Sequence, residues 1–591
     1  MARSLRMVRS LPRRLRKAAR YELIAHARRR PVRSDTVLYE SFSGNGMLCN
    51  PEAVFQGLLA APDLGHLKHV WVLADLAAHR TTIEKYAGNP RVRFVEYEST
   101  AYYTALATAK YLVNNSTFPP EFGKREGQVY VNTWHGTPLK AMGYDIPGGA
   151  LVTRNIVRNF VNADYLWAAN DDVATMYLKA YRLANIYRGA VVTAGSPRVD
   201  HQFVNAEQRE SVRAELRARG ASIAAGEKIL LYAPTWRGDF YDPVNDIPEL
   251  ATRVRLLQDK VAASGYRVLL KVHQQVYRYA AADRALRALL VPNDLATNRV
   301  LGATDVLVTD YSSVFVDFLA TGRPVLFLAP DLHEYQETRG LYLPAEDWPG
   351  PVRGTVDELA DDVNALGTGT PADPLVAYRE RYAKAAARYC AQEDGSATER
   401  LIDVVFRGRE SGVDVRRGFE DGRPRLLVYL GGLLGNGITT SALNMLAHID
   451  HDRVDVSVCF QNPRSEQRIA MAQSIDPRVR LFPRLGGING TRLAVRALLR
   501  PERRRLARGH ASDVVRHRDL LRAEFRRMFG STQFDYIVDF SGYGPLWNKI
   551  LLQGGARSYS IFQHNDLAAD AGLHTGRSTK SSKHRGNLLG V

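Results

Sequence analysis

The feature that most constrains the fold of this chain is a repeated alternation of short apolar strands with longer helical stretches. Such alternation predicts parallel sheets covered by helices. One series of predicted strands lies at 36–40, 70–74, 92–96, 111–115 and 129–134, and a second at 191–195, 228–234, 266–272, 305–310 and 324–330. We therefore predict an α/β chain with two Rossmann-like lobes, joined by a helical segment over 151–190. In two facing lobes of this kind, ligands lie in the cleft at the carboxyl ends of the strands.

A third α/β segment follows the first two. Residues 407–424 are charged and Gly-rich, which predicts a linker. After it, the strand 425–430 leads directly into the Gly-rich loop 431–437 and a helix, and another strand is predicted at 534–540. A loop in this position suits a nucleotide phosphate, but a Gly-rich loop alone is a weak signal. The strand pattern ends after residue 565, so we expect this lobe, 425–591, to be incomplete.

Two basic arms account for the net charge of +18. Residues 3–33 hold twelve Lys or Arg and one acid, and residues 492–527 hold twelve Arg and four acids. The second arm is either a membrane-facing surface or a solvated helix face.

The first arm carries apolar residues at helical spacing among its arginines. These residues are Leu5, Val8, Leu11 and Leu15. The pattern predicts a basic amphipathic segment over 1–34 that can lie on an anionic membrane surface. A solvated tail and a nucleic-acid-binding arm are the alternatives.

Other features narrow the class of protein. The chain has no run of 18 apolar residues, so no membrane-spanning helix is predicted, and no apolar stretch of a secretory signal follows the basic N-terminus. Cys49, Cys390 and Cys459 are far apart in the sequence, which predicts neither a disulfide framework nor a zinc site. A reducing, cytoplasmic location fits these features best.

Two histidines stand at predicted strand ends in opposite lobes. His135 lies in the block TWHGTPLK (133–140), where a histidine can take a proton from an attacking hydroxyl and Gly136 lets a ligand come close. His273 ends the block KVH (271–273), where a cationic group can stabilise charge that develops on a phosphate. A structural histidine bonded to backbone is the alternative for each. Their joint occurrence favours a catalytic site.

Two further blocks offer anion-binding groups. In TDYSS (309–313), Ser312 or Ser313 either binds an anion at the start of a helix or caps that helix. Asp317, one turn into the helix, could orient a neighbouring group. Arg237, in the block APTWR, either contacts a phosphate or lies on the surface beside a tryptophan. No P-loop and no Cys/His cluster with metal spacing is found, so the sequence demands neither a metal nor another cofactor.

Together these blocks resemble the CDP-glycerol glycerophosphotransferase family, the teichoic acid primases and polymerases. The resemblance runs from about Leu38 to Val405. It is carried by ESF (40–42), NP (50–51), WHGTPLK (134–140), AGSPRVD (194–200), YAPTWR (232–237), KVH (271–273), TDYSS (309–313) and GRPVLF (322–327). This many blocks in one order are far more specific than any single block.

The resemblance implies a glycosyltransferase-B-like arrangement of an acceptor-side lobe, 35–190, and a CDP-glycerol-binding lobe, 191–406. It also implies transfer of glycerol phosphate to a hydroxyl of a membrane-linked polyol phosphate acceptor, with CMP released, by a peripheral protein on the cytoplasmic face of the plasma membrane. In such a family His135 would act as the base and His273 would assist at the donor diphosphate. The substrate-binding residues are predicted to be Gly136, Thr137, Lys140, Arg237, Lys271, Thr309, Asp310, Ser312, Ser313 and Asp317.

Residues 425–565 resemble, less specifically, the N-terminal lobe of a second glycosyltransferase-B enzyme of the retaining type. A complete enzyme of that kind needs a donor-binding lobe of about 150 more residues, so we expect no sugar transfer by this segment.

Other functions remain open at this stage. The donor could be CDP-ribitol or another CDP-polyol, and a non-catalytic membrane scaffold could retain the same fold. A nucleic-acid partner is not expected, because it would leave the two strand-end histidines unexplained. A homo-oligomer stays an open alternative.

Overall fold

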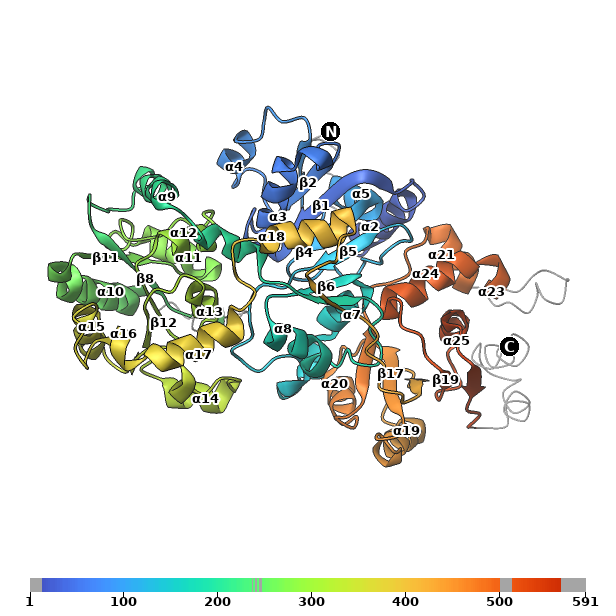
Figure 1. Cartoon of the computed structure of the whole chain (residues 1–591). Helices are drawn as coiled ribbons and strands as arrows, with labels where there is room; N and C mark the ends of the chain where they lie inside the picture. Colours follow the sequence, from blue (N-terminus) through green and yellow to red (C-terminus); the bar gives the residue numbers. More distant parts are fainter. Residues whose placement is uncertain (1–12, 236–237, 240–241, 244–246, 500–512, 565–591) are drawn as a thin grey trace.

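In a computed structural model of the chain, the described residues are 13–235, 238–239, 242–243, 247–499 and 513–564. Figure 1 shows three α/β lobes, with the first, in blue and cyan, between the second, in green and yellow, and the third, in orange and red. The predicted α/β fold class, with two main lobes and an additional one, is confirmed.

The first lobe is built on an eight-stranded sheet with the order β15-β7-β6-β5-β4-β1-β2-β3. All neighbours pair in parallel except β15, which runs antiparallel to β7 at the edge. The strands are β1 (Arg33–Glu40), β2 (Lys68–Leu73), β3 (Val92–Glu96), β4 (Ala109–Asn114), β5 (Val129–Asn132), β6 (Tyr165–Ala168), β7 (Ala190–Thr193) and β15 (Asp414–Arg416). Continuous apolar runs such as Val37, Leu38 and Tyr39 are fully buried, as expected for strands with helices on both faces.

Three parts of this sheet correct the sequence-based assignment. The strand at 191–195, predicted to open the second series, is β7 and pairs with β6 in the first sheet. Strand β6 lies within 151–190, which the sequence predicts to be helical, and β15 lies within the predicted linker 407–424. Strands of three or four residues carry too short a pattern to show that they form or which sheet they join.

The second lobe holds a five-stranded parallel sheet with the order β11-β8-β12-β13-β14. Its strands are β8 (Lys228–Ala233), β11 (Tyr266–Leu270), β12 (Val306–Thr309), β13 (Val325–Leu328) and β14 (Val352–Arg353). One face is covered by α9 (Ala206–Ala218), α12 (Thr297–Ala303), α13 (Val314–Leu319) and α17 (Arg379–Tyr389), and the other by α10 (Ile247–Val261), α11 (Gln274–Ala282) and α15 (Val356–Ala365). Each face therefore has its own apolar core.

The chain crosses between the first two lobes twice. It leaves the first sheet through η5 (Pro197–Gln202), which packs against both α3 (Cys49–Ala60) of the first lobe and α12 of the second. It returns through α18 (Ala397–Ile402), which lies across the first lobe in Figure 1. There Leu401 and Ile402 share an apolar core with residues of α3.

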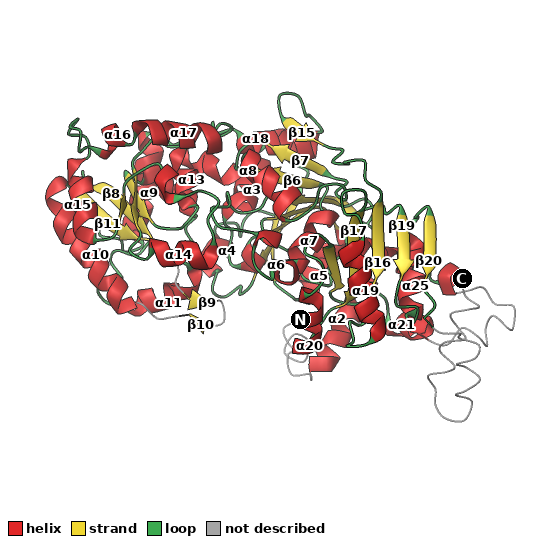
Figure 2. Cartoon of the chain, turned by 90° about the horizontal axis from the view of Figure 1, so that it is seen from below, coloured by secondary structure: helices red, strands yellow, loops and turns green. Residues whose placement is uncertain are grey.

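The third lobe has a five-stranded parallel sheet with the order β18-β17-β16-β19-β20, seen as a row of arrows at one end of Figure 2. Its strands are β16 (Arg425–Tyr429), β17 (Asp455–Gln461), β18 (Arg480–Arg484), β19 (Tyr536–Asp539) and β20 (Ser558–Ile561). Its helices are α19 (Gly437–His448), α20 (Glu466–Gln473), α21 (Arg492–Leu499), α23 (Asp513–Arg516), α24 (Arg518–Phe529) and α25 (Pro545–Leu551). Helix α24 packs against α7 (Arg154–Asn162) of the first lobe.

The described part of the N-terminal basic arm is α2 (Arg13–Ala27), which packs against α5 (Thr100–Thr108) of the first lobe. Ile24 is buried in this contact, and Arg20 donates to Glu98 at 2.8 Å. Leu5, Val8 and Leu11 lie outside the described residues.

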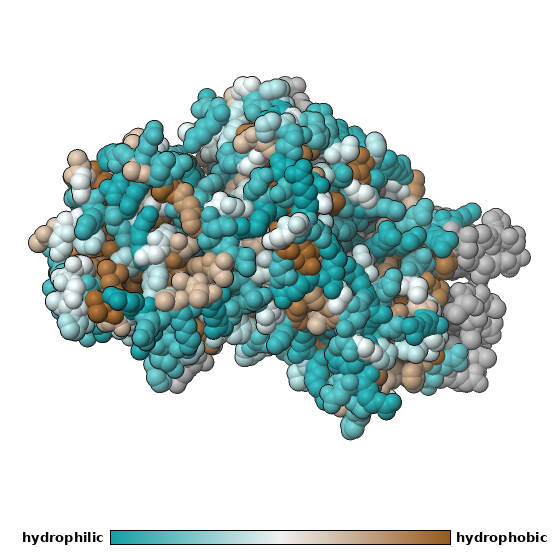
Figure 3. All heavy atoms as spheres, viewed as in Figure 1, coloured by the Kyte–Doolittle hydropathy of each residue, from teal (hydrophilic) through white to brown (hydrophobic). Residues whose placement is uncertain are grey.

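Among the described residues, no helix combines the length and the apolar character needed to span a bilayer. The face seen in Figure 3 is mostly hydrophilic, and its apolar side chains lie in small separate patches.

Candidate active site

His135 stands just beyond the end of β5, where the chain turns sharply. Asn132, the last residue of β5, accepts a hydrogen bond from Trp134 N, and Trp134 adopts a φ of 48°. The His135 ring lies against the rings of Trp134 and Phe42, and its Nδ1 is 2.8 Å from the carbonyl oxygen of Asn115 after β4. Because a carbonyl only accepts, Nδ1 carries the proton and Nε2 of the neutral ring can take one.

The electrostatic surroundings keep His135 neutral. Burial of the ring lowers its pKa to about 4, and the nearby positive charge of Arg198 acts in the same direction, against the hydrogen bond to Asn115. At neutral pH the ring is therefore an unprotonated, oriented base. Its position at the end of a parallel strand is where such folds hold their ligands.

Gly136 is one of the points at which the first lobe meets the second. Its φ is +152°, and a Cβ built there would lie 3.2 Å from Ser313 Oγ and 3.3 Å from Arg198 Nη2. Any side chain would crowd these groups, which explains the glycine. The predicted His135 block and the predicted TDYSS block are thus in direct contact.

Asp317 takes part in a buried ion pair that the sequence does not reveal. Arg198 Nε donates to Oδ2 at 2.8 Å and Nη2 to Oδ1 at 2.9 Å, and Asn298 Nδ2 donates to Oδ2 at 2.9 Å. Arg198 comes from η5, and its pKa is raised by Asp317 and Cys49 against the effect of burial. The carboxylate of Asp317 is thus bonded to Arg198 and Asn298, and its predicted role in substrate binding stays a prediction.

Asn50 ties the His135 loop to η5. Its Nδ2 donates to the carbonyl oxygens of Thr133 at 3.1 Å and Trp134 at 3.2 Å, and its Oδ1 accepts from Ser196 Oγ and from Arg198 N, both at 3.0 Å. Asn50 and Arg198 lie in two of the family-like blocks, but no sequence signal links them to each other or to the histidine.

On the second-lobe side, three basic residues come together. His273 lies at the start of α11, exposed to solvent, and its pKa is lowered by partial desolvation and by the charges of Lys271 and Lys140. Burial lowers the pKa of Lys271 to about 8. Lys140 reaches this side from the first lobe, with Nζ 5.2 Å from the ring centroid of Tyr335. The cluster provides positive charge at the ends of β11 and of the His135 loop.

Three further predicted site residues make hydrogen bonds within the protein. Thr309 Oγ1 donates to Ala233 O at 2.7 Å, Asp310 accepts from Thr235 N at 2.8 Å, and Thr137 Oγ1 accepts from Asn170 Nδ2 at 2.9 Å. These three side chains are buried and hold the loops that follow β5, β8 and β12.

Ser312 and Ser313 are half-buried at the start of α13, and the Ser313 hydroxyl makes no capping bond to that helix. Arg237 lies outside the described residues. Among the residues that the structure describes, no group of three or more His, Cys, Asp or Glu side chains could hold a metal ion.

Comparison with known proteins finds teichoic acid enzymes among the relatives. The teichoic acid poly(glycerol phosphate) polymerase of Bacillus subtilis (strain 168) is 28% identical over 414 residues, which are 65% of this chain and 50% of that protein. The chain thus spans half the length of this relative. The Bacillus spizizenii polymerase of the same description is 27% identical over 396 residues, 64% of this chain and 93% of that protein. A teichoic acid ribitol-phosphate primase from Bacillus spizizenii is 28% identical over 319 residues, 52% of this chain and 78% of that protein.

A solved structure of the wall teichoic acid polymerase TagF aligns with a TM-score of 0.55 at 23% identity. The alignment covers 66% of this chain and 93% of the TagF chain, and it establishes the fold. The family model described as CDP-glycerol:poly(glycerophosphate) glycerophosphotransferase matches residues 22–407. That range contains the first two lobes, apart from the edge strand β15, and the whole His135–Arg198–Asp317 site, and the chain belongs to this family.

Proposed function

We propose that the chain transfers glycerol phosphate from CDP-glycerol to a hydroxyl of a membrane-linked teichoic acid or related polymer and releases CMP. The observation that supports this most is the oriented, neutral His135 at the contact between two lobes. It faces a second lobe that carries His273 and Lys271, and Lys140 joins these two residues from the first lobe. The family supplies the reaction class, and these residues supply groups that suit its chemistry.

The proposed reaction is an in-line displacement at the β-phosphorus of CDP-glycerol. His135 Nε2 takes the proton of the acceptor hydroxyl, and the hydroxyl oxygen forms a bond to the β-phosphorus. The bond from that phosphorus to the bridging oxygen breaks, and the oxygen leaves with the electron pair as part of CMP. In this proposal His273, Lys271 and Lys140 stabilise the charge that develops on the donor phosphates.

The assignment of the lobes follows from these roles. We take the first lobe, with His135, as the acceptor side and the second lobe, with His273 and the start of α13, as the CDP-glycerol side. Ser312 and Ser313 would then contact donor phosphate. The acceptor's lipid anchor and exposed basic residues such as Arg29 and Arg30 beyond α2 support attachment to the cytoplasmic face of the plasma membrane.

The alternative donor is a CDP-activated ribitol. A relative named a ribitol-phosphate primase matches over more than half of this chain, so CDP-ribitol is the alternative substrate. Both donors present the same diphosphate to the second lobe and differ only in the polyol.

The test measures CMP release by the purified full chain with a lipid-linked glycerol phosphate acceptor and either CDP-glycerol or CDP-ribitol. We expect acceptor-dependent release from CDP-glycerol, and a fall of about 10²–10⁴-fold in kcat for His135→Ala, the range typical of a general base. His273→Ala should also lose activity. His448→Ala, an exposed histidine on α19 of the third lobe, is the control and should behave as wild type.

One result would reject the proposed reaction, and another would reject the proposed role of His135. A wild-type chain that releases no CMP from either donor would rule out the reaction. Full activity of a folded His135→Ala variant would rule out the role of this histidine while leaving the reaction class in place.

A further inference from the structure

Arg198 connects three parts of the site but has no role in the reaction as written above. Its guanidinium clamps Asp317 on α13, and its Nη1 lies 3.1 Å from the Sγ of Cys49. Its own backbone N–H donates to Asn50, which in turn holds the carbonyl oxygens of Thr133 and Trp134. A continuous set of hydrogen bonds therefore runs from the loop of His135 to the second lobe.

The contact made by Gly136 shows how close the two sides are. Ser313 Oγ and Arg198 Nη2 both lie within 3.3 Å of where a Cβ at Gly136 would be. The His135 loop, η5 and the start of α13 thus meet at one point. A shift of Arg198 would change the spacing between His135 and Ser313.

We propose that Arg198 is a positioning residue for the transfer: it holds the loop that carries His135 in register with the start of α13. This inference rests on the proposed function.

Burial supports a role beyond stability. The side chains of Arg198 and Asp317 are 9% and 10% exposed. A buried ion pair of this kind often contributes no more to stability than apolar residues of the same size, because both charges must be desolvated. The geometry of the pair favours a positioning role, because a guanidinium and a carboxylate fix both distance and orientation through two parallel hydrogen bonds.

Arg198 also acts on His135 through its charge. The groups that face Arg198 are Asp317, Cys49 and, at longer range, Glu393, and the groups packed on the His135 ring are the uncharged Trp134 and Phe42. Arg198 is the charged group that lowers the pKa of His135, in addition to burial. Removing its charge should therefore raise that pKa, whereas lysine at this position should leave it low.

The test compares Arg198→Lys with Arg198→Gln in the full chain, by the pH dependence of kcat/KM for CMP release. A displacement of about 1 Å can cost about 10²-fold in rate, so we expect both variants to lose on the order of 10²-fold in kcat. The acidic limb, which reports the base of the free enzyme, should stay in place for Arg198→Lys and move to higher pH for Arg198→Gln. KM for CDP-glycerol should change little.

Arg480→Gln is the matched control. Arg480 forms a similarly buried bidentate pair with Asp455, with side chains 5% and 9% exposed, but it lies in the third lobe away from His135. The Arg480→Gln variant should keep the wild-type kcat and the wild-type acidic limb in the pH dependence of kcat/KM. Asp317→Asn is the second variant, because it loosens the clamp while the Arg198 charge remains. For Asp317→Asn we expect kcat to fall, whereas the acidic limb of the pH profile should not move to higher pH.

The proposal would be overturned if a folded Arg198→Gln variant kept the wild-type kcat and the wild-type acidic limb of the pH profile. It would also be overturned if Asp317→Asn kept the wild-type kcat. If the wild type releases no CMP from either donor, the proposed function fails, and the placement of Arg198 is tested by histidine NMR. The His135 resonance, assigned by its loss in His135→Asn, should titrate at higher pH in Arg198→Gln than in wild type and Arg198→Lys. Identical titration in all three would overturn the inference.

Discussion

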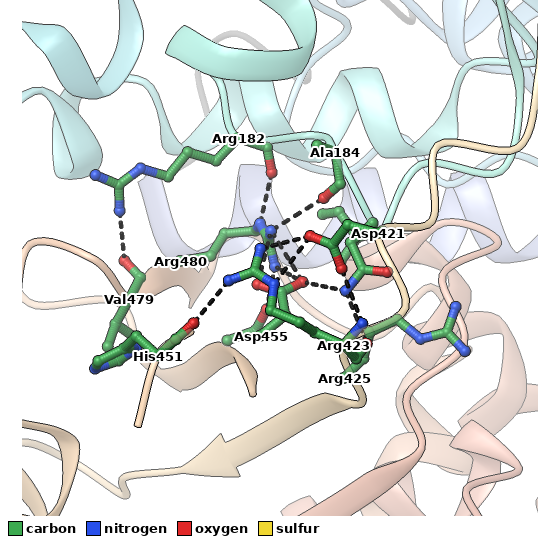
Figure 4. Close-up of polar contacts among 12 residues, drawn as sticks. Arg182, Ala184, Asp421, Arg423, Arg425, His451, Asp455, Val479 and Arg480 are labelled. Atoms are coloured by element: carbon green, nitrogen blue, oxygen red, sulfur yellow. Dashed lines mark hydrogen bonds and ion pairs between the residues drawn. The ribbon is translucent and has the colours of Figure 1, made fainter. Parts of the chain in front are cut away.

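The first lobe is joined to each of its neighbours through a buried bidentate Arg–Asp pair, but the two junctions are built differently. At the second lobe, Arg198 and Asp317 bridge the junction directly. At the third lobe, Arg480 and Asp455 pair within that lobe, and Arg480 reaches the carbonyl oxygens of Arg182 and Ala184 in the first lobe at 2.6 and 3.2 Å (Figure 4).

The apolar surroundings of the two junctions differ more than their ion pairs. One continuous core contains residues of both the first and the third lobe, such as Phe160 and Val161 with Phe482 and Phe529. The cores of the second lobe are its own, apart from Leu139, which reaches in from the His135 loop. The third lobe is thus fused to the first by apolar packing, whereas the second lobe is held mainly by directed polar contacts around the site.

This difference suggests that the junction with the third lobe contributes mainly to stability, whereas the junction with the second lobe contributes mainly to the reaction. Breaking the third-lobe junction should unfold or destabilise the chain, because it uncovers apolar surface. Breaking the second-lobe junction should first disturb the reaction, because little apolar surface depends on it. The predictions below test this division, beginning with the largest expected effect.

Gly530 packs tightly against the first lobe. Its φ is +60°, and a Cβ there would lie 1.7 Å from the carbonyl oxygen of Val161 on α7. Gly530→Ala cannot be accommodated without moving α24 away from α7, so we expect a loss of more than about 4 kcal/mol of stability. Gly555→Ala is the control, since its φ is +64° with no atom within 4 Å, and should cost only about 1–2 kcal/mol. Equal melting temperatures of the two variants would contradict close docking of the lobes.

Arg480→Gln should have the next largest effect, and on stability alone. It leaves Asp455 buried without its guanidinium, which typically costs about 3–5 kcal/mol. Denaturant unfolding of wild type and variant measures the loss, and CMP release at a temperature where both are folded measures activity. If kcat fell as far as in Arg198→Lys, the third lobe would have to act on the reaction, and the proposed division between the junctions would be wrong.

The same contrast explains which features the sequence predicts. Long buried strands such as β1 and β8, and the histidines at strand ends, follow from local patterns, because each is determined by a few neighbouring residues. The pairing of Arg198 with Asp317 joins residues 119 positions apart, and no periodicity marks it. For a similar reason the sequence did not predict that β6, β7 and β15 belong to the first sheet. Their strand partners are determined by the path of the whole chain.

The smallest effect concerns a second polar contact at the junction of the first two lobes. His201 of η5 lies with Nε2 2.8 Å from Glu52 Oε2 on α3. Burial alone would lower the pKa of His201, but the hydrogen bond and charge of Glu52 outweigh it and raise the pKa above the ordinary value of 6.5. The protonated pair therefore stabilises the fold below the unfolded pKa, and this contribution is lost as pH rises through the folded pKa.

Glu52→Gln removes the charge and keeps the shape. We expect it to lower stability by about 1 kcal/mol or less in mildly acid solution and by nothing once His201 is deprotonated in the wild type. The measurement is the difference in melting temperature between wild type and Glu52→Gln from about pH 5 to about pH 9, on both sides of the histidine transition. Glu98→Gln removes one of the two acidic partners of Arg20 on α2 and is the control, because a guanidinium does not titrate in this range. A difference for Glu52→Gln that is independent of pH would mean that His201 is neutral in the fold.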